Sequence, residues 1–188
     1  MSAPFPTAQL NQEHARILRL LDALEALVAA AAAAPHDAPL EDLAAAIAAL
    51  RDYADGAHHG KEEELLFPAL ERSGLPRHGG PVGCMLREHD EGRALIADMS
   101  DALADLEAGD GGRAAALASA ALGYTHLLRL HIQKEDTVLF PLAEQLLGEE
   151  LKLELLRGFS AIDDDRGAAD LARAIDELCA RWDPSPAR

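Results

Sequence analysis

The sequence predicts an all-α fold, an up-down-up-down four-helix bundle with a short helical C-terminal extension. Three observations support this fold class. Alanine and leucine, the strongest helix formers, are frequent, whereas β-branched residues are sparse. The 14 glycines and 10 prolines cluster at a few places, as expected of breakers between long helices. The connections between these helices are short, which favours antiparallel neighbours.

Four long segments carry apolar residues at helical spacing. They are expected at residues 7–33, 40–71, 82–106 and 113–147. Pro35 and Pro39 stop the first helix. The glycine- and proline-rich stretch 73–81 stops the second helix, and the loop 108–112 stops the third.

At 188 residues the chain has the length of one domain with a sizeable core. We expect residues 1–147 to form the bundle and residues 148–188 to form the C-terminal extension, packed on the bundle. Short helices are expected in the extension near residues 149–159 and 168–180. The extension could cover the bundle or mediate a homodimer.

The net charge of −16 argues against binding to nucleic acid, because neutralising phosphates requires an excess of Lys and Arg. It equally disfavours binding to an anionic membrane surface. The chain has no apolar run of about 20 residues, the length needed to span a bilayer. Its N-terminus lacks the basic-then-apolar pattern of a signal peptide, so a cytoplasmic location is expected.

Each of the four apolar stripes carries a histidine where an ordinary helix would carry leucine or alanine. These histidines are His14, His58, His89 and His131. A lone histidine on an apolar face is more often a satisfied core residue than a ligand. Glu62 and Glu135, however, also lie on the stripes, and buried carboxylates are rare unless they are paired or bound to a metal. The combination therefore indicates a metal site.

The glutamates follow His58 and His131 by four residues, a spacing that places both side chains on one helix face. Each His-x-x-x-Glu pair directs an imidazole and a carboxylate at the same point in the bundle interior. Imidazole suits iron and other first-row metals, and a carboxylate can bridge two ions. The remaining ligands should come one each from the first and third helices. The predicted ligand set is His14, His58, Glu62, His89, His131 and Glu135.

An internal repeat fixes the register of these motifs. Residues 58–68, HHGKEEELLFP, align without gaps on residues 131–141, HIQKEDTVLFP. His59 also precedes a glutamate by four residues, but the repeat aligns it with Ile132. We therefore expect His59 to lie beside the ligands or in solvent. Of the acidic run 62–64, only one member is expected to point inward.

Two further residues could lie beside the ligands. Tyr124 precedes His131 by seven residues and so shares its helix face two turns away. It could hydrogen-bond near the metals or simply pack in the core. Arg93, one turn after His89, could pair with the acidic site.

Together these motifs resemble the hemerythrin-like proteins, also called the HHE cation-binding domain. The resemblance rests on Glu13-His14, on the two His-x-x-x-Glu…Leu-Phe-Pro segments and on the stretch 79–93, and it spans roughly residues 7–147. Such proteins look like four-helix bundles with a non-haem di-iron centre that reacts with dioxygen, nitric oxide or peroxide. The resemblance implies that the four histidines are terminal ligands and that the two glutamates bridge two iron ions. Zinc or manganese would accept the same ligands.

The resemblance is to the bacterial branch with four histidines and two glutamates. The oxygen-carrying hemerythrins have a fifth histidine four residues after the third-helix histidine, and an aspartate five residues after the fourth-helix histidine. Here Arg93 occupies the first of these positions, and Glu135 follows His131 by four residues. Reversible dioxygen transport is therefore not what the resemblance implies.

Three functional hypotheses follow. The di-metal centre could bind dioxygen, nitric oxide or peroxide, in sensing, iron handling or stress defence. It could instead be a di-iron oxidoreductase that turns over peroxide or nitric oxide or repairs iron centres. Finally, the metal could be purely structural and only fasten the bundle. No phosphate-binding glycine loop or hydrolase arrangement is recognisable.

Overall fold

The computed structural model describes residues 4–182, and every regular element in this range is helical. The first long stretch is α1 (Pro6–Ala33). The second consists of α2 (Leu40–Ala49), the π-helical segments η2 (Leu50–His59) and η3 (Glu62–Leu66), and α3 (Phe67–Arg72). The third is α4 (Gly80–Glu107). The fourth consists of α5 (Ala114–Lys134), the π-helical segment η5 (Glu135–Leu139) and α6 (Phe140–Leu146). Then come α7 (Glu149–Arg166) and α8 (Ala168–Trp182).

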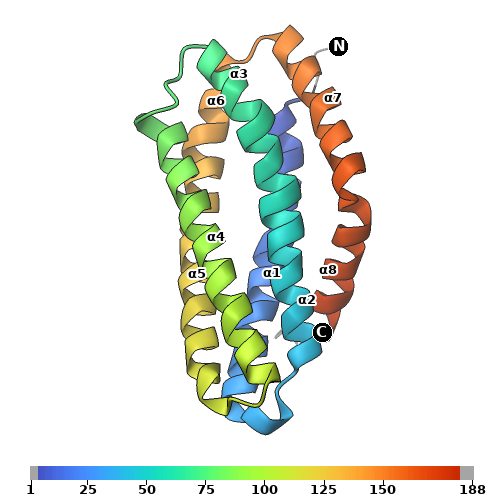
Figure 1. Cartoon of the computed structure of the whole chain (residues 1–188). Helices are drawn as coiled ribbons and strands as arrows, with labels where there is room; N and C mark the ends of the chain where they lie inside the picture. The colour runs from blue at the N-terminus through green and yellow to red at the C-terminus, as the bar shows by residue number, and fades with distance from the viewer. Residues whose placement is uncertain (1–3, 183–188) are drawn as a thin grey trace.

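The four long stretches lie side by side along a common direction (Figure 1). Helix α5 packs against α1 and α4, and α2 packs against the same two helices. The extension runs along the outside of the bundle, where α7 contacts η2 and η3 and α8 contacts α1 and α2 (Figure 1). Both helices of the extension therefore contact the long stretches. The homodimer stays an expectation, and residues 183–188 lie outside the described residues.

Two clusters of buried apolar residues form the core. On α1, Leu10 belongs to one cluster and Ile17 to the other, and His14 lies between them. On α4, Met85 and Ile96 flank His89 in the same way. The core is therefore interrupted by one polar layer, at the level of the histidines.

Most helix boundaries lie within two residues of the predicted ones. The exception is α7, which continues to Arg166 rather than ending near Phe159. The stop signal is Gly167, which adopts the left-handed conformation (φ 62°) that glycine tolerates and that commonly ends helices. In the part of the chain that the structure describes, no helix is both long enough and apolar enough to cross a bilayer.

The packing of α8 predicts a stability effect. Leu178 is 2% exposed and belongs to the larger core cluster. Leu178→Ala should lower the free energy of unfolding by about 2–5 kcal/mol, because it removes buried methyl groups and leaves a cavity. Leu153→Ala, at an exposed position of α7, should change it by less than about 0.5 kcal/mol. Urea unfolding of both variants measures this, and equal losses would contradict the packing of α8.

Candidate metal centre

The buried histidines and glutamates form two groups of potential metal ligands. Each residue contributes one nitrogen or oxygen atom that could bind a metal. Within a group, these atoms all lie within 4.8 Å of one another. One group is His14, His58, Glu62 and Glu135, and the other is His59, Glu62, His89 and His131. All these residues are at most 4% exposed. The structure thus brings together all six predicted ligands, and it adds His59 to their surroundings.

Four of the imidazoles face each other in two pairs, which we call pair A (His14 and His58) and pair B (His89 and His131). The two Nε2 atoms are 3.0 Å apart in pair A and 3.1 Å apart in pair B. Two nitrogens that bind one ion at about 2.1 Å and at a right angle to each other are about 3.0 Å apart. The rings within the pairs are tilted by 58° and 59°, so nitrogen atoms rather than ring faces converge. Each pair has the spacing to hold one metal ion.

The two glutamates lie between the pairs. Oε2 of Glu135 is 3.2 Å from the nearer Nε2 of pair A and 3.3 Å from that of pair B. For Glu62, Oε1 is 3.8 Å from an Nε2 of pair A, and Oε2 is 3.5 Å from an Nε2 of pair B. Both carboxylates are therefore placed where they can bridge two ions.

The carboxylates of Glu62 and Glu135 are buried without a partner. Their four oxygens have no hydrogen bond among the described residues, and the nearby imidazole nitrogens lack the geometry for one. Burial, together with the adjacent Glu135, raises the pKa of Glu62 well above its usual value. The pKa of Glu135, which burial alone would raise, is lowered to about 2 by His131 and His14. Buried carboxylates without partners are strongly unfavourable, so this interior fits cations.

The surroundings of His14 favour positive charge in the same way. Burial lowers the pKa of His14, but the hydrogen bond to Asp136 and the negative charge of Glu135, 3.2 Å away, outweigh this effect and raise it to about 9. Such a shift means that the protein stabilises a cation at this position by more than desolvation destabilises it. A metal ion would meet the same stabilisation.

A carboxylate holds the other nitrogen of each buried imidazole. Nδ1 contacts Asp136 in His14 (2.6 Å), Glu13 in His58 (2.9 Å), Asp55 in His59 (3.3 Å), Glu63 in His89 (2.7 Å) and Glu88 in His131 (3.0 Å). An ionised carboxylate only accepts hydrogen bonds, so in the neutral imidazole Nδ1 donates. The lone pair of Nε2 then points to the centre, where it can bind a metal.

The lysines of the internal repeat complete this network. Nζ of Lys61 is 2.5 Å from Glu13, and Lys134 contacts Glu88 in the equivalent way. Lys61 also lies 2.5 Å from Asp163 of α7. The side chain of Lys61 is 1% exposed and that of Lys134 is 40% exposed, so the extension covers only one of the two lysines.

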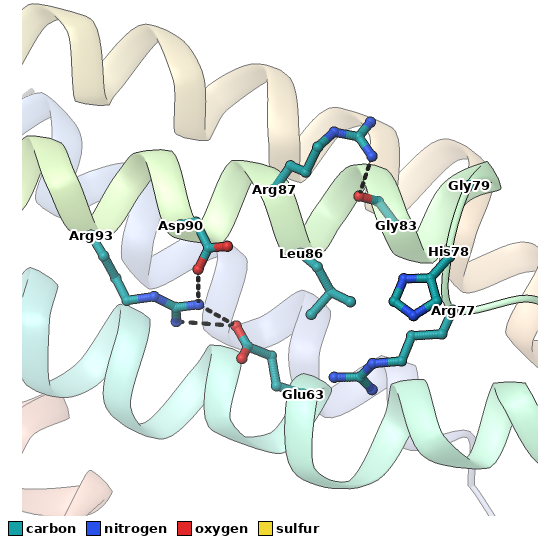
Figure 2. A pocket seen from close by; sticks show the side chains of 9 residues that line it. All are labelled: Glu63, Arg77, His78, Gly79, Gly83, Leu86, Arg87, Asp90 and Arg93. Atoms are coloured by element: carbon teal, nitrogen blue, oxygen red, sulfur yellow. Dashed lines mark hydrogen bonds and ion pairs between the residues drawn. The ribbon is translucent and has the colours of Figure 1, made fainter.

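The prediction that only one carboxylate of the run 62–64 points inward is wrong. Glu63 is half-buried and accepts hydrogen bonds from His89 and from Arg93, the latter at 3.0 Å. Figure 2 shows Arg93 of α4 reaching across to Glu63 while also contacting Asp90. Arg93 therefore contacts the acidic surroundings of the centre, as expected, through a carboxylate that orients a predicted ligand. A surface pocket of about 580 Å³ borders this contact.

His59 is buried, so the expectation that it could be solvated is wrong. Its ring stacks on that of His89, with centroids 3.8 Å apart and planes 13° from parallel. A metal ion lies near the plane of an imidazole that binds it, and two parallel rings this far apart do not share such a position. The other expectation, that His59 contacts a ligand without binding metal, remains our prediction.

The π-helical segments were not predicted, and proline accounts for two of them. Segments η3 and η5 each lie just before a Phe-Pro pair. Proline lacks the N–H that would bond four residues back, and its ring clashes with that carbonyl. For Pro68 and Pro141 this carbonyl falls inside η3 and η5. Such widened turns are frequent at functional sites, and here each begins at a predicted ligand glutamate.

Tyr124 is buried beside the centre. It lines a small cavity together with His59, His89 and His131. Burial raises the pKa of its hydroxyl, and the charge of Asp55 raises it further. The phenol therefore keeps its proton at neutral pH.

The donor atoms of this layer, two imidazole pairs and two carboxylates between them, match the donor set of a bridged two-metal site. The sequence model of the hemerythrin HHE cation-binding domain matches residues 6–143. The chain belongs to this family. Comparison with curated proteins and with solved structures gave no significant match. The matched part of this hemerythrin-like chain contains all six predicted ligands, and α7 and α8 follow it.

The carboxylates that hold Nδ1 predict an effect on metal affinity. Glu88→Ala should weaken iron(II) binding about 10- to 100-fold, because it frees the ring of His131 and removes the partner of Lys134. Glu91→Ala, an exposed position on the same helix, should leave the affinity unchanged. Anaerobic competition with a chromogenic chelator measures both. Equal affinities in the two variants would show that the contact does not orient a ligand.

Proposed function

We propose that this chain is a non-haem di-iron protein that binds dioxygen, nitric oxide or peroxide, in sensing, iron handling or stress defence. In this proposal, pairs A and B are the terminal ligands, and Glu62 and Glu135 bridge the two ions. One observation carries the proposal. The two oxygens of Glu62 face different imidazole pairs, so a single carboxylate belongs to two donor groups.

The donor types support iron. Imidazole and carboxylate ligands suit iron, and zinc or manganese also accepts them. Two imidazoles and two carboxylate oxygens per ion leave room for an exogenous ligand on a six-coordinate metal. When bound, iron would supply Lewis-acid and electron-transfer chemistry.

The protein's own groups would orient the imidazoles and keep bulk water away, because every predicted ligand is at most 1% exposed. The proposal includes the up-down-up-down order of the four long stretches, favoured by their short connections. It also includes a cytoplasmic location. The charge of −16 supports the absence of nucleic acid among the partners.

Metal analysis and spectroscopy test the proposed function. Protein purified without added metal should contain about two iron ions per chain, and its visible spectrum should change on reduction. Adding nitric oxide, dioxygen or peroxide to the reduced protein should give a stoichiometric adduct. Sustained turnover would instead support an oxidoreductase. A loaded protein that responds to none of the three would support a purely structural metal.

Two single substitutions test the ligand set. Glu62→Ala should reduce the metal content to one ion or fewer per chain and lower the melting temperature of the loaded protein, because it removes a bridge. His59→Ala should leave the metal content unchanged, because we expect His59 to stack on a ligand rather than to bind metal. Elemental analysis of both variants decides the matter. If His59→Ala loses metal and Glu62→Ala does not, the assigned register is wrong.

A further inference from the structure

The two halves of the centre are related by the internal repeat but have different surroundings. Tyr124 precedes His131 by seven residues, and the residue seven before His58 is Arg51. Tyr124 is 1% exposed, whereas the side chain of Arg51 is 59% exposed and paired with Asp52. The buried hydroxyl of Tyr124 thus has no counterpart at the equivalent position of the repeat.

A second difference concerns space. The dipeptide Glu-His occurs on both α1 and α4. The residue three positions after the histidine is Ile17 on α1 and Gly92 on α4. Ile17 is 1% exposed and fills its place in the core. Gly92 has no side chain and instead lines the small cavity beside pair B. A position that is filled beside pair A is therefore left open beside pair B.

The cavity matches a ligand of very few atoms. Its volume is about 10 Å³, near the minimum that accommodates one water-sized molecule. Both imidazoles of pair B line it, together with His59, Gly92 and Tyr124. A molecule of at most two heavy atoms is the largest class that this space suits without rearrangement of the helices.

The hydroxyl of Tyr124 also supports the binding of a small ligand in this cavity. Its oxygen is buried and has no hydrogen-bond partner among the residues that the structure describes. Buried hydroxyl groups in folded proteins almost always have a partner, and an exception calls for a ligand, ion or water that supplies one. Tyr124 is a donor beside a cavity lined by two predicted metal ligands.

Access also differs between the halves. Asp163 of α7 covers Lys61 beside pair A, whereas Lys134, beside pair B, is 40% exposed. The extension therefore covers the lysine beside pair A and leaves the lysine beside pair B exposed to solvent.

We propose that the exogenous ligand binds on the pair B side, in the cavity beside Gly92, and that the hydroxyl of Tyr124 donates a hydrogen bond to it. The ligand class is a molecule of two heavy atoms with an acceptor atom. This inference rests on the proposed function, because the ligand needs a loaded centre. Beyond that function, it specifies the side of the centre on which the ligand binds and the residue that hydrogen-bonds to it.

Tyr124→Phe tests the hydrogen bond, and Tyr53→Phe is its matched control. Tyr53 is the other tyrosine of the chain, is 3% exposed and accepts a hydrogen bond from Arg16 at 3.1 Å. In the iron-loaded, reduced protein, Tyr124→Phe should raise the dissociation rate of nitric oxide about 5- to 10-fold and shift the N–O stretching frequency. Tyr53→Phe should change neither.

The melting temperature of the metal-free variants distinguishes a hydrogen bond to the ligand from a structural role of the Tyr124 hydroxyl. Metal-free Tyr124→Phe should melt at the same temperature as the wild type or higher, because it loses a buried hydroxyl without a partner. Metal-free Tyr53→Phe should melt at a lower temperature, because it loses a hydrogen bond. A clear loss of stability in metal-free Tyr124→Phe would show that the hydroxyl has a structural partner and would overturn the proposal.

Gly92→Ala tests the cavity. The added Cβ would lie 3.5 Å from Cε2 of Tyr124 and 4.0 Å from Cδ2 of Leu127, so it fits without a clash but narrows the cavity. Nitric oxide affinity should fall about tenfold while the metal content stays constant. Gly123→Ala is the control, because its Cβ also has a nearest neighbour at 3.5 Å, on Leu95, and Gly123 does not line the cavity.

The outcomes distinguish the inference from the proposed function. If the wild-type protein binds no metal, or binds metal without forming an adduct, the proposed function fails. If the adduct forms and has the same dissociation rate and N–O frequency in the Tyr124→Phe and Tyr53→Phe variants, only the inference fails. The same holds if Gly92→Ala binds nitric oxide as tightly as Gly123→Ala.

Discussion

Two carboxylates facing each other inside an apolar bundle are the constraint on which the rest of this structure depends. Glu62 and Glu135 are 0% exposed, with apolar clusters on both sides of their layer. Ionised carboxylates in such a place are strongly unfavourable without nearby positive charge. The bundle surrounds them with imidazole nitrogens instead of water. Their position is therefore stable only when cations, or protons in their place, share the layer with them.

The charges around the layer favour bound cations. Seven carboxylates contact the buried imidazoles, namely Glu13, Asp55, Glu62, Glu63, Glu88, Glu135 and Asp136. Three cationic side chains contact these carboxylates, namely Lys61, Arg93 and Lys134. Lys61 and Arg93 also contact Asp163 and Asp90, so negative charge remains in excess around the layer. The outer carboxylates thus contribute charge as well as orientation to the imidazoles.

Spacing along single helices predicted the fold and the inner residues, because helical periodicity shows which side chains share a face. Spacing along a single helix does not predict which residues contact each other between helices. Glu13 holds a histidine of the second stretch and not its neighbour His14, a pairing that depends on how two helices are set against each other. The equal spacing of Lys61 and Lys134 in the repeat was visible in the sequence, but their partners lie on other helices. The burial of His59 was missed because it follows His58 inside a π-helical turn, where successive side chains diverge less than in an α-helix.

The near-symmetry of the predicted ligands means that any difference between two ions bound there would have to come from residues that do not repeat. The ligand pairs and their carboxylates correspond across the repeat, so they would hold both ions in nearly the same way. His59, Gly92 and Tyr124 lie on one side only, and α7 covers the opposite side. Helix α7 lies beyond the matched residues 6–143, yet its Asp163 contacts the lysine that supports the carboxylate of a predicted ligand. The extension is therefore part of the centre's surroundings, and it covers the lysine beside pair A but not the lysine beside pair B.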